Sequence, residues 1–231
     1  MQSSESGKII LAEIDLSMIP HHLDHYVRLS MDARSDIEWW AQYVESWNGI
    51  QMMRAIKGAA PAAVMTSDAS GGWGCGAYAG PHWFILKWAG PISECHITVK
   101  EMVPIVIAAA LWAPSWHGKN VIVQCDNSAV VSIINHGASK NQDAMHLARC
   151  LAFITAKFDF HMQAAHIKGV DNILADALSR DNLPLFRSLH PQADKDATPI
   201  PEPLFDLLIL SKPDWTSRHW TGLWNSIFRM D

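Results

Sequence analysis

The hydrophobic pattern between residues 62 and 125 constrains the fold more than any other feature of the sequence. Its first part alternates with a period of two, and Gly71-Gly72 and Gly80-Pro81 interrupt it as turn signals. The alternating runs cover residues 62–70, 73–79 and 82–88, with a further run over residues 94–99. Short runs of β-forming residues between glycine turns predict an antiparallel meander.

The next part of the pattern is apolar on nearly every side. Residues 101–112 predict a buried helix, and Pro104 is tolerated in its first turn. The run NVIVQC at residues 120–125 is continuously apolar, as in a strand that is covered on both faces. A meander followed by such a helix and strand predicts a sheet with helices packed against it.

The remaining elements extend this sheet. Residues 128–135 and about 142–158 predict helices, because their apolar positions recur at three and four residues. Residues 160–167 predict a strand, and residues 172–179 predict a last short helix. The order β-β-β-α-β-α-α-β-α predicts an α/β fold with a mixed five-stranded sheet, three antiparallel strands and then parallel strands, flanked by helices.

Changes in composition divide the chain into three parts. Residues 1–59 are a flanking or connection segment with one amphipathic helix, at residues 32–48. Residues 60–182 form the α/β domain. Residues 183–231 begin with a proline-rich linker and end in a short tryptophan-rich helical tail, which cannot bury a core alone.

Cysteine spacing and hydropathy indicate the compartment. The four cysteines are far apart and form no CxxC pair, which favours a reducing compartment over a disulfide framework or a zinc site. The polar, acidic N-terminus does not resemble a signal peptide. The longest apolar run, residues 102–113, is too short to span a bilayer. The sequence therefore predicts an intracellular protein, cytoplasmic or nuclear, with no membrane partner.

Four acidic residues lie at positions where a charge needs a partner. Asp68 falls within an apolar strand, and Glu101 opens the buried helix. Asp126 follows the strand NVIVQC, and Asp176 lies inside the short helix with the sequence ILADAL. Because open α/β sheets gather strand ends and helix starts at one edge, the four carboxylates are expected to converge there.

Converging carboxylates are typical ligands of hard divalent cations. Two cations about 4 Å apart polarise a scissile phosphate, generate hydroxide from water and stabilise the departing oxygen. Magnesium takes oxygen ligands and needs no His or Cys. The sequence therefore predicts a site for two Mg²⁺ ions, for which Mn²⁺ can substitute. Each acid also has a simpler reading, since Asp126 could cap a helix and Asp176 could pair with Arg180.

The charge balance depends on these acids. The net charge of −5 argues at first against a nucleic-acid partner. Residues 60–182, however, hold eight Lys and Arg against nine Asp and Glu, and four of those nine are the candidate ligands. Bound cations would leave this region mildly basic. We expect modest affinity for phosphates and a domain that works tethered to something that holds its substrate.

Four segments carry a resemblance to a known family. TSDASGGWGCGAY, ITVKE, VIVQCDNSAVVSIIN and HIKGVDNILADALSR together resemble the type 1 ribonuclease H domain of retroelement reverse transcriptases. The resemblance covers about residues 60–182, and the ending N-x-x-A-D-x-L-S-R is its most specific motif. The flanks, with Trp39-Trp40 and the tail PDWTSRHWTGLW, are similar to those of DIRS-like retrotransposons. This implies either a fragment of a polyprotein that also carries polymerase and recombinase parts, or a stand-alone remnant in a host genome.

The resemblance implies a ribonuclease H-like fold and hydrolysis of the RNA strand of RNA/DNA hybrids during reverse transcription. By position, Asp68 would bridge both metal ions, and Asp176 would join it on the ion that activates the attacking water. Glu101 and Asp126 would complete the ligands of the second ion. The expected selectivity is for RNA beside DNA, with 2′-hydroxyls read across the minor groove.

Two further matches and one departure complete the comparison. Ser70 and Asn127 match positions that often contact the hybrid. Many family members carry a histidine in a mobile loop after the fifth strand, but here the segment HIKGVDNILAD is compact and His166 lies within the strand.

Two alternative functions remain open. One is a catalytically silent module with structural or interaction roles, left from a reverse transcriptase polyprotein. The other is a nuclease of the same fold that cuts duplex DNA.

Overall fold

The computed structural model describes residues 28–30, 33, 34, 37, 41 and 63–207. Contacts divide the chain into two units, residues 1–50 with 213–231 and residues 51–212, and all the elements below belong to the second unit. The predicted helix at residues 32–48 falls mostly outside the described residues, and so does the tryptophan-rich tail after residue 207.

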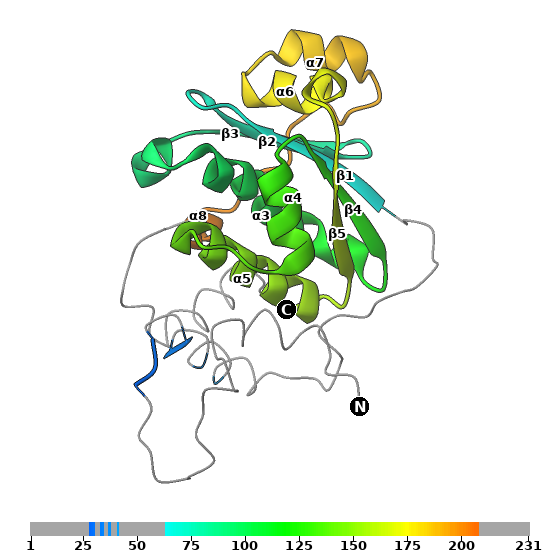
Figure 1. Cartoon of the computed structure of the whole chain (residues 1–231). Helices are drawn as coiled ribbons and strands as arrows, with labels where there is room; N and C mark the ends of the chain where they lie inside the picture. The colour runs from blue at the N-terminus through cyan, green and yellow to red at the C-terminus, as the bar shows by residue number, and fades with distance from the viewer. Residues whose placement is uncertain (1–27, 31–32, 35–36, 38–40, 42–62, 208–231) are drawn as a thin grey trace. The chain divides into compact units, whose positions relative to one another are not determined.

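A mixed five-stranded sheet is the centre of this unit (Figure 1). Its strands are β1 (Ala63–Ala69), β2 (Gly74–Ala79), β3 (His82–Lys87), β4 (Asn120–Cys125) and β5 (His161–His166). They lie in the order β3-β2-β1-β4-β5. The first three pair antiparallel, and β4 and β5 continue the sheet parallel to β1. The predicted mixed five-stranded sheet, with three antiparallel strands and then parallel strands, is therefore confirmed.

Helices cover both faces of the sheet. They are α3 (Ile97–Trp116), α4 (Ser128–His136), α5 (Gln142–Lys157), α6 (Ile173–Ser179), α7 (Leu183–Leu189) and α8 (Pro203–Leu207). In Figure 1, α6 and α7 lie on one face, and α3, α4 and α5 lie on the other. Contacts agree, because α6 packs on β1 and β2 while α3 packs on the same two strands and on α5.

Helix α3 is the core helix that the apolar run predicted, but it begins earlier. It is buried along most of its length, and among the described residues it is the one helix long and apolar enough to cross a membrane. Most of that apolar surface is buried inside the protein. A core helix of 20 residues explains this composition without a membrane.

The run at residues 94–99 is not a strand, and that prediction is wrong. Residues Gly90–Glu94 form a 3₁₀ turn, η2, and Ile97 begins α3. The β-branched residues Ile97, Thr98 and Val99 suggested a strand. The side chain of His96, however, accepts a hydrogen bond from the backbone N–H of Thr98 and caps the helix. Glu101 consequently lies in the second turn of α3 rather than at its start.

The segment after α6, which its prolines predict to be a linker, lies against the sheet over residues 183–198. We call these residues the edge segment. The backbone N–H groups of Asp194 and Thr198 donate to the carbonyls of Pro81 and Trp83, beside and on the edge strand β3. Pro184 fits the first turn of α7, where a missing N–H costs little. The edge segment thus covers a strand edge that would otherwise be open to pairing.

Candidate metal centre

Three of the predicted carboxylates converge. Asp68, Glu101 and Asp126 each offer one carboxylate oxygen, and these oxygens all lie within 4.8 Å of one another. The register of the parallel strands explains part of this. Thr66 of β1 pairs with Gln124 of β4, so two residues further along each chain Asp68 comes beside Asp126. Glu101 reaches the same carboxyl ends of β1 and β4 from the second turn of α3.

Glu101 is the acid whose environment most needs a cation. The residue is 5 % exposed, and its Oε2 atom is buried with no hydrogen-bond partner among the described residues. An orphaned carboxylate oxygen in the interior is costly unless a cation or a donor satisfies it. The pKa of Glu101 is raised to about 9, mostly by burial and further by the neighbouring Asp68 and Asp126 carboxylates. These residues fit a hard cation, which would supply the missing partner and offset the repulsion.

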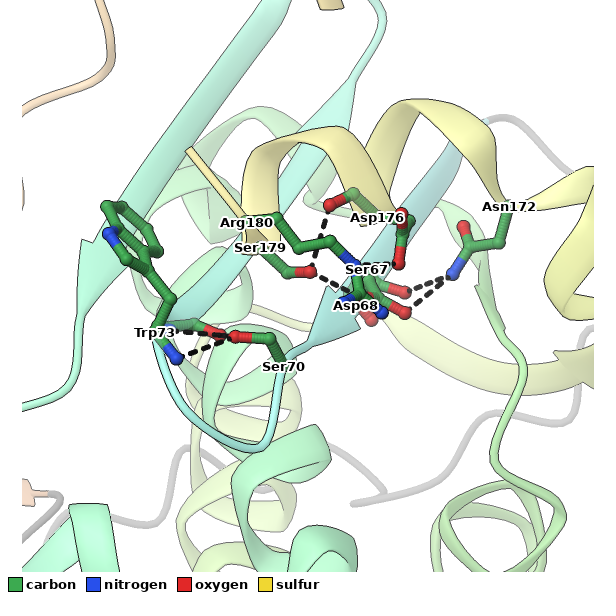
Figure 2. A network of polar contacts seen from close by, with 9 residues as sticks. Ser67, Asp68, Ser70, Trp73, Asn172, Asp176, Ser179 and Arg180 are labelled. Atoms are coloured by element: carbon green, nitrogen blue, oxygen red, sulfur yellow. Dashed lines mark hydrogen bonds and ion pairs between the residues drawn. The ribbon is translucent and has the colours of Figure 1, made fainter. Parts of the chain in front are cut away.

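Asp68 is buried on β1, and both of its carboxylate oxygens accept hydrogen bonds (Figure 2). The side-chain amide of Asn172 donates to Oδ1 at 3.2 Å, and the hydroxyl of Ser179 donates to Oδ2 at 2.5 Å. Burial raises the pKa of Asp68 to about 6, although the hydrogen bond from Ser179 lowers it. Without a bound cation, the Asp68 carboxyl therefore loses its proton at a higher pH than an exposed aspartate does.

Asp126 lies directly after β4, where the chain of Gly169 approaches it. A Cβ atom added at Gly169 would lie 2.9 Å from Oδ2 of Asp126, closer than real Cβ contacts allow. The short 3₁₀ turn η3 (Gly169–Asp171) therefore lies against this carboxylate, and a side chain at residue 169 would require the carboxylate to shift. The ring of His166 contacts the backbone oxygen of Asp126 at 3.1 Å, beside the centre.

The structure does not place Asp176 in the same group. Its carboxylate accepts a hydrogen bond from Nε of Arg180 at 2.6 Å, and its side chain is 43 % exposed. This is the i,i+4 pair that sequence spacing offered as the simpler reading. Asp176 still lies near enough to raise the pKa of Asp68. An exposed ion pair is worth little, so a bound cation could break it. The role of Asp176 as a fourth ligand stays a prediction.

Ser70 and Asn127 shape the loops beside the centre. The hydroxyl of buried Ser70 accepts from the backbone N–H groups of Trp73 and Gly74 at 3.0 and 2.9 Å, within the β1–β2 turn. The side-chain oxygen of Asn127 caps α4 by accepting from the N–H groups of Ala129 and Val130. Contact of either residue with a substrate stays a prediction.

Sequence reasoning missed three residues around the centre, namely Gly169, Asn172 and Ser179. A signal for two of them was present. Asn172 and Ser179 are seven residues apart, which is two helical turns, so they lie on one face of α6. The same face had to meet the sheet, because Ala175 and Leu178 are buried. Polar residues on a buried helix face indicate a buried polar partner, which here is Asp68.

The raised pKa values make stability depend on pH. The Asp68 and Glu101 carboxyls have ordinary pKa values of 3.8 and 4.5, which apply to the unfolded chain, and about 6 and about 9 in the folded chain. Between the unfolded and the folded pKa of each group, the folded state therefore binds more protons than the unfolded chain. The stability of the fold falls as pH rises through these two ranges. Because Mg²⁺ needs ionised carboxylates, we expect the stabilisation by Mg²⁺ to grow over the same range.

Thermal unfolding of the full chain at pH 5.5 and 8.5, in EDTA and in Mg²⁺, measures both effects. Glu101→Gln removes the titrating group with the highest pKa. In EDTA, its melting temperature is therefore expected to fall less between pH 5.5 and 8.5 than that of the parent chain. A melting temperature in EDTA that depends on pH equally in Glu101→Gln and the parent chain would contradict this assignment.

Comparison with known proteins gives a distant structural neighbour. No protein-family model matches the chain, and no curated protein matches it. Among solved structures, the crystal structure of RNase H1 from the halophilic archaeon Halobacterium salinarum NRC-1 is similar over 53 % of this chain and 96 % of that one. The sequence identity is 14 % and the TM-score is 0.38. Residue roles are therefore taken from the contacts of this chain itself.

Proposed function

We propose that this protein is a divalent-cation-dependent endonuclease that hydrolyses the RNA strand of RNA/DNA hybrids. One observation carries the proposal. The carboxylate of Glu101 is buried beside those of Asp68 and Asp126, and one of its oxygens has no partner among the described residues. A chain that needed α3 only for packing would gain stability from an apolar residue at this position.

The residues of the centre suit magnesium. Asp68, Glu101 and Asp126 would hold the cation through oxygen atoms alone, and Asp176 would join them after releasing Arg180. A bound cation supplies Lewis-acid activation of water and stabilises the charge that develops on a scissile phosphate. The protein's part is to fix the carboxylates, since each comes from a different element of the core.

The substrate class follows from the resemblance described for residues 60–182, and the environment of the centre is compatible with it. The cluster lies at the carboxyl ends of β1 and β4, bordered by the β1–β2 turn and by η3. A hybrid would lie across these strand ends, with Ser70 and Asn127 in the bordering loops. Cleavage during reverse transcription, with polymerase and recombinase parts in the same polyprotein, belongs to the same proposal.

Incubation of the full chain with a hybrid carrying end-labelled RNA tests the activity. We expect cleavage of the RNA strand in Mg²⁺, no cleavage in EDTA, and no cleavage of matched RNA/RNA or DNA/DNA duplexes. Cutting of duplex DNA would show a nuclease of different selectivity. An intact hybrid at saturating protein and Mg²⁺ would favour the silent structural module and overturn the proposal.

A further inference from the structure

Helix α6 places two buried polar side chains against the carboxylate of Asp68, one on each oxygen (Figure 2). Asn172 precedes the helix and is 1 % exposed, and Ser179 ends it and is 0 % exposed. Both side chains are donors toward Asp68, and they reach it from two turns of one helix. The buried carboxylate of Asp68 on β1 is thus held from the two ends of one helix, α6, which packs on the sheet.

We infer that Asn172 and Ser179 are positioning residues that fix the carboxylate of Asp68 for cation binding. The inference rests on the proposed function, because the cation is the one that the centre is proposed to hold. A carboxylate with a donor on each oxygen cannot rotate about its terminal bond without losing a hydrogen bond. Each oxygen keeps a further lone pair, and these are available to a cation.

The close docking of α6 fixes how far these donors lie from Asp68. Gly76 of β2 pairs with Asp68 across the antiparallel ladder, and a Cβ atom at Gly76 would lie 2.4 Å from Cβ of Leu178. The helix therefore approaches the sheet as closely as a glycine allows, directly beside Asp68. Ser179 follows Leu178, so its hydroxyl is carried to Asp68 by this contact.

Each positioning residue has a second acceptor within hydrogen-bond distance. The amide of Asn172 also donates to the backbone oxygen of Ser67 at 3.1 Å. The hydroxyl of Ser179 also contacts the backbone oxygen of Asp176 at 3.0 Å, within its own helix. The Asn172 amide can serve both acceptors, because its NH2 group has two hydrogens. The single hydroxyl hydrogen of Ser179 is shared, and its shorter contact is the one to Asp68.

A purely structural role predicts a different outcome. If Asn172 and Ser179 only satisfied a buried acid, their removal would lower the melting temperature and leave cation affinity unchanged. If they position Asp68, their removal weakens cation binding by about 10-fold to 100-fold, the range for lost outer-shell partners. Affinity and stability together therefore separate the two roles.

The experiment measures Mn²⁺ binding to the full chain by electron paramagnetic resonance, with Mg²⁺ as competitor. The test variants are Ser179→Ala and Asn172→Ala. Ser188→Ala is the control for the loss of a hydroxyl bond, because the exposed Ser188 hydroxyl donates to the carbonyl of Leu185 without touching a carboxylate. Asn135→Ala is the control for the second, because the Asn135 amide makes two hydrogen bonds to the backbone of Ala164.

We expect the dissociation constant of Mn²⁺ to rise about 10-fold to 100-fold in Ser179→Ala and Asn172→Ala and to change less than about twofold in both controls. Ser179→Thr keeps the hydroxyl and is expected to retain most of the affinity. Hybrid cleavage by Ser179→Ala should recover as Mg²⁺ is raised, with the KM for hybrid unchanged.

The outcomes separate this inference from the proposed function. Test variants that bind Mn²⁺ like the parent chain, while melting at lower temperature, overturn the positioning role alone. Weakened binding in the test variants, with no hybrid cleavage by the parent chain, supports the positioning role and overturns the nuclease. A parent chain that binds no Mn²⁺ overturns both.

Discussion

Replacing Asp68 by Asn is expected to reduce Mg²⁺-dependent cleavage of a hybrid by about 100-fold to 1000-fold or more, the rate equivalent of several kcal/mol of lost charge stabilisation. Asp68 lies at the middle of the centre, close to Glu101 and Asp126 and bound by Ser179 and Asn172. The substitution keeps the shape of the side chain and removes its charge. Single-turnover cleavage at saturating protein measures the loss.

Asp159→Asn is the matched control for this prediction. It removes the same charge two residues before β5 begins, at the opposite end of the strands from the centre. Asp159 adopts a positive φ of 49°, which asparagine tolerates well, so the control should fold and cleave like the parent chain. Mg²⁺-dependent cleavage that survives in Asp68→Asn would remove Asp68 from the reaction and contradict the assigned centre.

Replacing Phe186 by Ala is expected to destabilise the protein by about 3–5 kcal/mol, the usual cost of deleting a buried phenylalanine ring. Phe186 is fully buried in α7, and its ring packs against Trp83 at 5.3 Å and Tyr78 at 6.4 Å between ring centroids. For a domain of this size the loss corresponds to a fall in melting temperature of roughly 6–20 °C. Thermal and urea unfolding measure it.

Leu189→Ala gives the comparison within the same helix. Leu189 is an exposed apolar residue of α7, so its truncation should change the free energy of unfolding by less than about 0.5 kcal/mol. Equal effects of Phe186→Ala and Leu189→Ala would mean that the edge segment does not contribute to the core. The same contacts mean that a fragment ending at residue 182 would lose part of the core.

The sequence predicted most of the sheet because its period is local information. Alternation and glycine turns located β1, β2 and β3, and the continuous run NVIVQC located β4. The prediction of a strand at residues 94–99 is wrong because β-branched residues favour strands but also occur in helices. Here the His96 cap begins a helix. The linker prediction missed the edge segment for a related reason. Its prolines predict a linker, whereas Leu183 begins α7, Pro184 lies in the first turn of that helix and Phe186 is buried.

The candidate site was only partly predictable for the same physical reason. Asp68 and Asp126 could be expected to meet because both lie at the carboxyl ends of neighbouring parallel strands. Glu101 joins them from the second turn of α3, a position that the expected helix start at residue 101 did not give. The pairing of Asp176 with Arg180 depends on side-chain rotamers, which spacing allows but does not require. The approach of Gly169 to Asp126 depends on the path of a loop. Such contacts between distant segments arise from packing and have no local pattern.

The most direct test of the centre is a titration of the full chain with Mn²⁺, followed by electron paramagnetic resonance and competed with Mg²⁺. We predict saturable binding that Mg²⁺ displaces and that Glu101→Gln weakens by at least about 10-fold, because the orphaned oxygen of Glu101 then no longer carries charge. Binding of equal strength in Glu101→Gln, or no saturable binding by the parent chain, would contradict the central claim that these three carboxylates hold a cation.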